Sequence, residues 1–236
     1  MDVTRTARRS ALPTGDEKRR QVETMFDRVA PRYDRVNRAM TFGLDRRWRR
    51  RTVAALGLGP GSTVLDLGCG TGDLCEELRV ADHHAVGIDM SAGMLAAAHT
   101  GAPLVRGDAL MLPVAGGAAD GVVSAFALRN VVDLGELFVE CARALRPGGR
   151  VAMLETSEPA NPVVRSGHRL WFRGVVPLVG RVLGSDADAY RYLPRSAAYL
   201  PPAPALLALV GDAGFTDVGR RVLGAGAVQL VTGTRR

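Results

Sequence analysis

A short apolar run that leads into a loop with glycine at every second position constrains the fold of this chain most. The run 64–67 is followed by Gly68, Gly70 and Gly72, and Asp73 comes directly after them. Glycine has no Cβ, so the backbone can turn tightly here and approach a ligand closely. A buried strand that enters a helix through such a loop is typical of nucleotide-binding α/β sheets. We therefore expect the loop to bind a ligand.

Strand-like and helix-like segments alternate after this loop. Apolar runs typical of buried parallel strands lie at 63–67, 85–88, 104–106, 121–126 and 150–154. Helical patterns lie between them, and the one at 133–145 begins with Asp133 and Glu136 in capping spacing. This alternation predicts an α/β fold, with a mostly parallel twisted sheet and helices on both faces. Two runs at 216–223 and 227–232, separated by glycines, predict a C-terminal antiparallel hairpin.

The chain reads as one domain with a short tail. Residues 1–13 are polar and charged without an apolar period, which predicts disorder. One helix is expected from Thr14 until Pro31, and another with Asp45 as its N-cap. The domain 14–236 then comprises N-terminal helices (14–60), a ligand-binding core (61–155), an amphipathic helical insertion or lid (156–200), and a C-terminal helix and hairpin (201–236).

Acidic residues follow the next two predicted strands. Asp89 ends the second strand and precedes Met90, and Asp108 ends the third and precedes Ala109. Ligands of open α/β sheets bind at the carboxyl ends of the strands, so these residues are expected beside the glycine loop. Asp89 can accept hydrogen bonds from ribose hydroxyls, and Asp108 from an adenine amino group. Taken singly, Asp89 also fits a helix cap, although Ser91 fits that role better, and Asp108 also fits an ordinary loop residue.

The spacing of the glycines separates two adenosine-containing ligands. The dinucleotide fingerprint is G-x-G-x-x-G, with pyrophosphate at the helix N-terminus. Here the third glycine, Gly72, comes one residue early. S-adenosylmethionine has no phosphate and needs no phosphate cradle. We therefore favour this methyl donor over a dinucleotide, and a purely structural glycine turn is the third interpretation.

Composition limits the other partners. The three cysteines and four histidines have no metal-ligand spacing, which predicts reduced thiols and no metal. The net charge of +7 suits nucleic acid, anionic lipid, an acidic substrate or simply a solvated basic face. The chain has no run of eighteen apolar residues, and residues 1–20 lack the apolar core of a secretory signal. We expect a cytoplasmic protein.

Motifs outside the generic core carry a narrower resemblance. These are the segments 25–34 (MFDRVAPRYD), 127–131 (ALRNV) and 188–193 (DAYRYL), with Asn37, Met40, Phe42, Gly43 and Trp48. Together with the core 64–154, they resemble the ubiquinone/menaquinone biosynthesis C-methyltransferases (UbiE/MenG type) of the class I methyltransferases. The resemblance covers almost the whole chain after residue 20. It implies a Rossmann-like fold and methylation of a ring carbon of a polyprenylated quinol, most directly demethylmenaquinol.

The resemblance also implies roles for individual residues. Donor contacts are expected at Asp66, Gly68, Gly70, Thr71, Gly72, Asp89, Met90, Asp108, Ala109, Ser124 and Ala125. On the acceptor side, we expect Arg129 to stabilise a phenolate, Asn130 to hydrogen-bond a ring oxygen, and Tyr33 to stack on or bond to the ring. A surface arginine and a helix-packing tyrosine are the alternative interpretations of Arg129 and Tyr33.

Four positions depart from the family pattern. Ala125 stands where serine is common, Thr156 where phenylalanine is, Arg195 where glutamate is, and Val231 where histidine is. Ser124 is adjacent, but a hydroxyl contact at 125 is lost. Because the departures cluster on the substrate side, methylation of another phenolic or lipophilic small molecule is the main alternative.

A polyprenyl acceptor resides in the membrane, which implies peripheral contact with anionic lipid at its inner face. The apolar segment 171–183 and the arginine-rich segment 46–51 would supply it, although 171–183 also suits a lid or a homodimer contact. Nucleic acid is not expected, because amino-group methylases usually carry an Asn/Asp-Pro-Pro-aromatic tetrad after the fourth strand, where 124–130 reads SAFALRN. A non-catalytic donor-binding protein is the last alternative.

Overall fold

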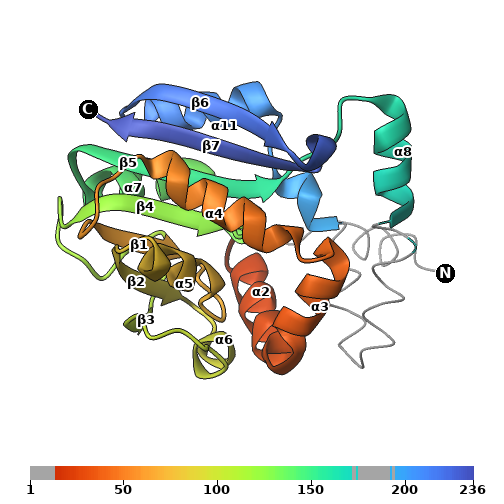
Figure 1. Cartoon of the computed structure of the whole chain (residues 1–236), viewed down its shortest axis with the longest axis horizontal. Coiled ribbons are helices and arrows are strands. Elements are labelled where there is room, and N and C mark those ends of the chain that lie inside the picture. Colours follow the sequence, from red (N-terminus) through yellow and green to blue (C-terminus); the bar gives the residue numbers. More distant parts are fainter. Residues whose placement is uncertain (1–13, 172–173, 175–191, 193–194) are drawn as a thin grey trace.

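The protein is organised around a central sheet. The computed structural model describes residues 14–171, 174, 192 and 195–236. Among these residues the sheet has seven strands in the order β3-β2-β1-β4-β5-β7-β6 (Figure 1). The strands are β1 (Thr63–Leu67), β2 (His84–Asp89), β3 (Leu104–Arg106), β4 (Ala119–Ala125), β5 (Leu145–Thr156), β6 (Phe215–Leu223) and β7 (Val228–Arg235). Strands β1 to β5 pair in parallel, whereas β7 is antiparallel to both β5 and β6. The mostly parallel sheet and its C-terminal antiparallel pair are confirmed.

Helices cover both faces of this sheet, as predicted (Figure 1). Two of them, α4 (Leu44–Leu56) and α5 (Asp73–Val80), lie on one face, and α7 (Leu134–Ala144) and α11 (Ala203–Asp212) lie on the other. The remaining described helices are α2 (Gly15–Val29), α3 (Tyr33–Thr41), α6 (Ala92–Ala96), α8 (Pro162–Leu170) and the 3₁₀ turns η1 (Ala30–Arg32), η2 (Leu128–Asn130), η4 (Ala197–Tyr199) and η5 (Gly224–Gly226).

The core is divided by the sheet into two layers. Neighbouring strand residues such as Val122 and Val123 point to opposite faces, so each strand contributes to both layers. One layer joins the strands to α4 and α5, with Leu56 fully buried at its centre. The other joins them to α7 and α11 around the fully buried Phe138. Burial on both faces explains why the central strands read as continuous apolar runs.

The order of the strands creates the position of the site. The chain proceeds from β1 outward to β2 and β3, and β4 then returns to the other side of β1. The loops after β1 and β4 therefore separate at the carboxyl ends of these strands. Such a switch point is where ligands bind in open α/β sheets.

The N-terminal helices differ from the expectation. Helix α2 ends at Val29, close to the predicted stop. Helix α3 was not predicted, because Val36 is its one buried residue and a single apolar position gives no helical period. Asp45 is not an N-cap: Gly43 occupies that position in the left-handed region, and Asp45 is buried one residue inside α4, where it pairs with Arg49. The tail 1–13 and residues 172–173, 175–191 and 193–194 of the insertion lie outside the described residues. None of the described helices is long and apolar enough to cross a bilayer.

Candidate active site

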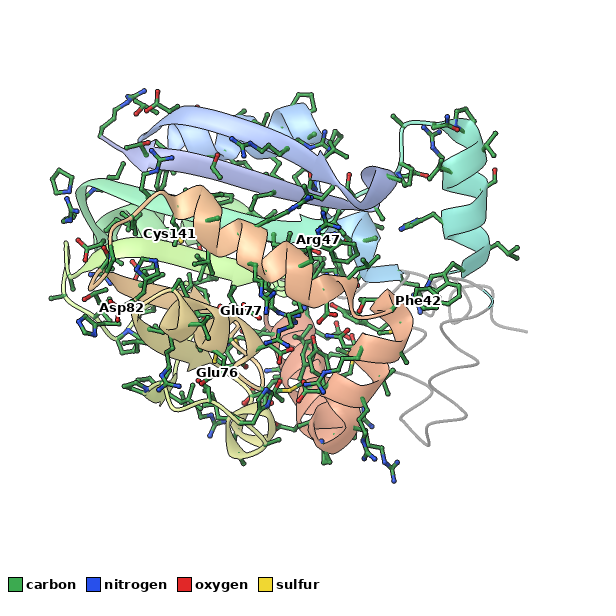
Figure 2. The ribbon with its side chains drawn as sticks, in the orientation of Figure 1. Phe42, Arg47, Glu76, Glu77, Asp82 and Cys141 are labelled. Atoms are coloured by element: carbon green, nitrogen blue, oxygen red, sulfur yellow. The ribbon has the colours of Figure 1, made fainter. Side chains whose placement is uncertain are left out.

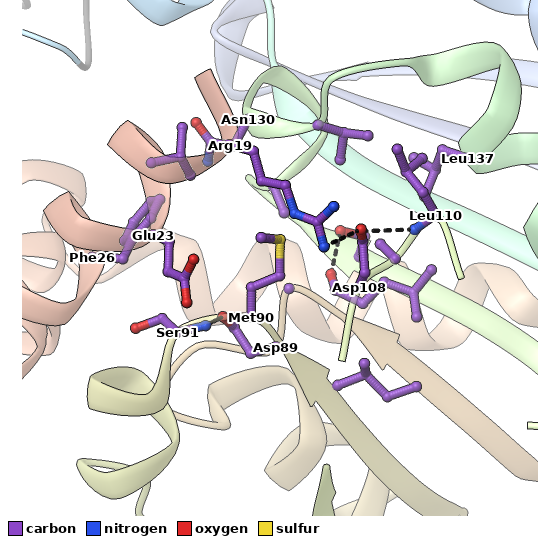
Figure 3. A pocket seen from close by; sticks show the side chains of 18 of the residues that line it. Arg19, Glu23, Phe26, Asp89, Met90, Ser91, Asp108, Leu110, Asn130 and Leu137 are labelled. Carbon is purple, nitrogen blue, oxygen red and sulfur yellow. Dashed lines mark hydrogen bonds and ion pairs between the residues drawn. The ribbon is translucent and has the colours of Figure 1, made fainter. Parts of the chain in front are cut away.

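A first cavity lies at the carboxyl ends of β1, β2 and β4 and has a volume of about 300 Å³. The glycine loop and the ends of β2 and β4 form its floor, and α2 lies across it (Figure 3). Of the predicted donor contacts, those lining the cavity are Gly68, Gly70, Asp89, Met90, Asp108, Ala109, Ser124 and Ala125. Asp66, Thr71 and Gly72 are not among its lining residues. We call this space the donor cavity.

Two positions of the glycine loop, Gly68 and Gly72, have a backbone conformation and neighbours that exclude a Cβ atom. Gly68 has φ +67°, and a Cβ built on it would lie 2.6 Å from the Cβ of Ala127. Gly72 has φ +90°, and its Cβ would lie 2.4 Å from Cγ2 of Thr100. L-residues rarely adopt this region of φ, and real Cβ atoms do not approach so closely. The loop therefore keeps a Cβ-free surface at Gly68, against the wall of the donor cavity.

Asp89 fixes the glycine loop to the end of β2. Its Oδ2 accepts a hydrogen bond from the backbone N–H of Gly70 at 2.8 Å, and its Oδ1 accepts one from Ser91 at 2.8 Å. Burial raises the pKa of the Asp89 carboxyl, and the backbone donors oppose that rise. Ser91, rather than Asp89, caps α6 by accepting from the backbone of Met94. The expectation that Ser91 fits the cap better than Asp89 is therefore confirmed.

Asp108 faces a residue that sequence reasoning missed. Its Oδ1 accepts from the backbone of Leu110 at 3.0 Å, and its Oδ2 lies 2.7 Å from a guanidinium nitrogen of Arg19, which reaches over from α2 (Figure 3). Arg106 on β3 likewise contacts Glu23 of α2 at 2.8 Å. Nothing in the local sequence indicates these pairs, because they join segments more than eighty residues apart.

The charge of the donor cavity favours a cationic ligand. Its described lining includes the carboxylates of Asp16, Glu23, Asp89, Asp108 and Glu136, against a single cation, Arg19. A pyrophosphate would be repelled by this arrangement, whereas a sulfonium and an amino group are attracted to it. The glycine surface, the acidic lining and the volume fit S-adenosylmethionine and disfavour a dinucleotide.

Thr71 serves the neighbouring helix instead of the cavity. Its hydroxyl donates to Oδ1 of Asp34 on α3 at 2.6 Å. Nδ1 of His99 lies 3.4 Å from the other oxygen of Asp34, and its Nε2 lies 3.1 Å from Asp73. This network ties the start of α3, where Tyr33 lies, to the glycine loop.

Asp66 is buried beneath the loop, with its Oδ2 accepting from the thiol of Cys75 at 3.3 Å. Burial raises the pKa of its carboxyl to about 7. In the unfolded chain it ionises at an ordinary value near 3.8. Between these two values the unfolded state binds fewer protons than the folded state, so the free energy of unfolding falls as pH rises across that interval.

We expect Asp66→Asn to remove the fall in the free energy of unfolding that Asp66 causes as pH rises. In urea titrations of the protein without donor, the variant should gain stability relative to the parent between pH 5 and pH 8, by about 1.4 kcal/mol for each unit of the suppressed pKa difference. Asp120→Asn is the matched control, because Arg146 lowers the pKa of the Asp120 carboxyl below 3.8, so this carboxyl is ionised in both states from pH 5 to pH 8 and its removal should leave the slope of the parent unchanged. Equal slopes for the Asp66 variant and the parent would contradict the expectation.

A second cavity, of about 450 Å³, adjoins the first. Phe26, Tyr33 and Phe126 line both cavities. The rest of its described lining is largely apolar and comes from α2, α3, α4, α8 and β7, with Met25, Val29, Met40, Trp48, Trp171 and Val228 among its members. Its shape and chemistry suit a lipophilic molecule that meets the donor at the shared aromatic residues. We call it the acceptor cavity.

Arg129 brings a positive charge to the acceptor cavity. Its side chain is 8% exposed, so it is not a surface arginine, and it forms an ion pair with Glu155, whose side chain is 1% exposed. The backbone of Arg129 also donates to Glu155, at 3.2 Å. A guanidinium has five N–H donors, so the group keeps donors for a ligand beside this contact.

Asn130 and Tyr33 occupy different positions relative to the two cavities. Asn130 lines the donor cavity, and its Oδ1 accepts from the hydroxyl of Tyr192 at 3.3 Å. Tyr33 lines both cavities. Burial raises the pKa of the Tyr33 phenol, which keeps it neutral and able to donate a hydrogen bond. The structure thus brings Arg129 and Tyr33 to the acceptor cavity and places Asn130 on the donor side.

The positions that depart from the family pattern are spread over the structure. Ala125 lines the donor cavity, and the adjacent Ser124 directs its hydroxyl to the carbonyl of Leu67 at 2.7 Å. Thr156 lines the acceptor cavity. Val231 is buried in the core, and Arg195 is exposed.

The arginine-rich segment 46–51 is less available to lipid than its sequence indicates. Arg46 and Arg50 each contact Glu77 of α5 at 2.9 Å. Arg49 is buried between Asp45 and Asp73. Three of the five cations of this helix are therefore engaged within the protein.

Comparisons with known proteins also indicate a methyltransferase. The ubiE/COQ5 methyltransferase family matches residues 14–235. A demethylmenaquinone methyltransferase from Roseiflexus sp. (strain RS-1) is 43% identical over 237 residues, which cover 96% of this chain and 98% of the relative. Among solved structures, a SAM-dependent methyltransferase from Thermotoga maritima has a TM-score of 0.63 at 18% identity, covering 91% of this chain and 100% of that one. Phosphoethanolamine N-methyltransferase 2 of Haemonchus contortus, in complex with S-adenosyl-L-methionine, has a TM-score of 0.60 at 14% identity. The match covers 80% of this chain and 52% of the Haemonchus chain.

Proposed function

Because the chain belongs to the ubiE/COQ5 methyltransferase family, we propose that it methylates a ring carbon of a polyprenylated quinol, most directly demethylmenaquinol. The observation that carries this proposal is the apolar acceptor cavity, which shares three aromatic residues with the donor cavity. A lipophilic aromatic ring held there would adjoin the methyl donor. The relatives named demethylmenaquinone methyltransferase support the choice of acceptor.

S-adenosylmethionine supplies an electrophilic methyl group on its sulfonium and leaves as S-adenosylhomocysteine. On the protein side, Asp89 accepts from the ribose hydroxyls and Asp108 from the adenine amino group, beside the backbone of Ala109. Gly68 and Gly70 let the backbone approach the donor closely. The carboxylates around the donor cavity favour the positive charge of the sulfonium.

The acceptor must become nucleophilic at carbon. When a quinol hydroxyl loses its proton, the phenolate pushes electron density onto the neighbouring ring carbon, which forms the new C–C bond. The hydrogen on that carbon then leaves as a proton and the ring regains its aromaticity. Arg129 stabilises the phenolate oxygen, and Tyr33 holds the ring at the junction of the two cavities. Asn130, which lines the donor cavity, hydrogen-bonds a ring oxygen that reaches this junction.

Peripheral contact with an anionic membrane is part of the proposal, since the acceptor is membrane-borne. Two exposed leucines near the acceptor cavity, Leu44 and Leu170, support it better than the arginine-rich segment does. Cytoplasmic localisation, at the inner face of the membrane, is part of the same proposal. A homodimer is a further proposal; its expected contact, 171–183, lies mostly outside the described residues. No nucleic-acid partner is proposed.

The test is S-adenosylhomocysteine release by purified protein supplied with S-adenosylmethionine and reduced demethylmenaquinone in detergent, with the methylated product identified by mass spectrometry. Turnover is expected with the quinol and not with the oxidised quinone, which has no hydroxyl to ionise. Turnover with other phenols alone would replace the acceptor and favour the alternative of a different lipophilic substrate. Donor binding without turnover on any acceptor would favour a non-catalytic protein.

A further inference from the structure

Phe42 combines two unfavourable features, at the C-terminal end of α3 (Figure 2). Its backbone lies in the left-handed region with φ +52°, a conformation that is costly for a residue with a bulky side chain. Its side chain is 74% exposed, and it is the one aromatic residue among the large apolar side chains that the described part of the chain exposes. Folding gains little from a strained and exposed phenylalanine.

Phe42 also belongs to the lining of the acceptor cavity. Its ring lies against Trp171, with centroids 4.9 Å apart and an angle of 36° between the planes. Trp171 is half-buried and lines the same cavity. Leu44, 44% exposed, lines it as well, and Leu170, 72% exposed, precedes Trp171. At this end, the apolar wall of the cavity continues onto the surface of the protein.

The acceptor cavity meets the donor cavity away from Phe42, because Tyr33 is the first residue of α3 and Phe42 follows its last. Phe26, Tyr33 and Phe126 line both cavities there, and Arg129 is its buried cation. The cavity thus has a polar, donor-facing end and an apolar end that is open to the surface at Phe42. Its volume of about 450 Å³ matches one small molecule, so a tail of many isoprene units has to continue outside it.

We propose that the isoprenoid tail of the acceptor leaves the cavity across the packed aromatic pair of Phe42 and Trp171, and that this pair sets the preference of the enzyme for long-tailed over tail-less quinols. This inference rests on the proposed function and specifies how its substrate is selected. The two packed rings provide an apolar surface over which a branched hydrocarbon chain can pass. They act on the tail, so the chemistry at the ring should be insensitive to them.

The test compares Phe42→Asn with the parent. Asparagine tolerates the left-handed conformation, so the variant removes the ring without adding backbone strain. The expected result is a fall in kcat/KM of about 10- to 100-fold for reduced long-tailed demethylmenaquinone. For the tail-less 1,4-naphthalenediol, kcat/KM should stay within about twofold of the parent. Val80→Asn is the matched control, since Val80 is 78% exposed and outside the lining of both cavities.

A binding measurement gives a second readout. The chain has two tryptophans, and both Trp48 and Trp171 line the acceptor cavity. Quinones quench tryptophan fluorescence, so titration with oxidised demethylmenaquinone reports binding without turnover. Phe42→Asn should weaken binding of the long-tailed quinone by about 10- to 100-fold and leave that of 1,4-naphthoquinone unchanged.

The outcomes separate the inference from the proposed function. If the parent turns over no quinol, the proposed function fails. If the parent is active and Phe42→Asn loses activity equally on both quinols, the tail passage is overturned. A defect that appears with acceptor in vesicles, and disappears when cyclodextrin delivers it, would assign Phe42 to the membrane and likewise overturn the passage.

Discussion

Arg129→Ala is expected to lower kcat/KM for the quinol by about 10³-fold and the free energy of unfolding by about 3–5 kcal/mol. The loss of activity follows from losing the cation that stabilises the phenolate in the acceptor cavity. The loss of stability has a different cause. Glu155 is almost completely buried, and without Arg129 its charge would remain in the interior without the ion pair.

A second variant separates the two effects. In Arg129→Ala/Glu155→Gln the buried negative charge is removed together with the cation. Part of the lost stability should return, because a neutral amide is less costly to bury than an unpaired carboxylate. Activity should stay as low as in the single variant. Urea titrations give the stabilities, and release of S-adenosylhomocysteine gives the rates.

Arg129→Lys tests the geometry of the charge. Lysine keeps a cation but loses the planar fork that can contact Glu155 and a phenolate at the same time. We expect it to retain most of the stability and to remain well below the parent in kcat. If Arg129→Ala, once shown to be folded, turned over the quinol at the parent rate, Arg129 would have only a structural role.

The sequence predicted the floor of the donor cavity because that floor is built from local signals. The glycine loop and Asp89 each follow a strand directly, and parallel strands bring such positions together at one edge of the sheet. The same reasoning placed Thr71 among the donor contacts, whereas its hydroxyl donates to Asp34. Sequence spacing locates the backbone of a loop but does not say which neighbour its side chains meet.

The roof of the donor cavity could not be predicted, because it depends on packing between segments distant in sequence. Arg19 reaches Asp108 only because α2 crosses the carboxyl ends of the strands. Arg49 appeared as one of several surface cations, although it is buried between two carboxylates. Phe42 was noted as part of a motif, but neither its exposure nor its backbone conformation can be read from neighbouring residues.

Asp89→Asn is expected to weaken binding of both S-adenosylmethionine and S-adenosylhomocysteine by about 10²- to 10⁴-fold. A hydrogen bond to a charged group contributes about 1.5–3 kcal/mol, and two ribose hydroxyls are proposed to bond to this carboxylate. The substitution also weakens the anchoring of the loop, because Gly70 and Ser91 donate to the same side chain. Asp120→Asn is the control, since it removes a carboxylate outside both cavities.

Calorimetric titration at several pH values tests the role of the charge. The ionised carboxylate is the form that accepts from both ribose hydroxyls. The affinity for S-adenosylhomocysteine should therefore be highest at high pH and fall as pH drops through the pKa of Asp89. Burial raises that pKa, so the fall should begin above the range of an ordinary aspartate, and Asp89→Asn should not show it. An analogue of S-adenosylhomocysteine that lacks both ribose hydroxyls separates direct contact from loop anchoring. It should bind the parent weakly and lose little more in the variant, whereas an equal loss for both ligands would mean that Asp89 acts only by holding the loop.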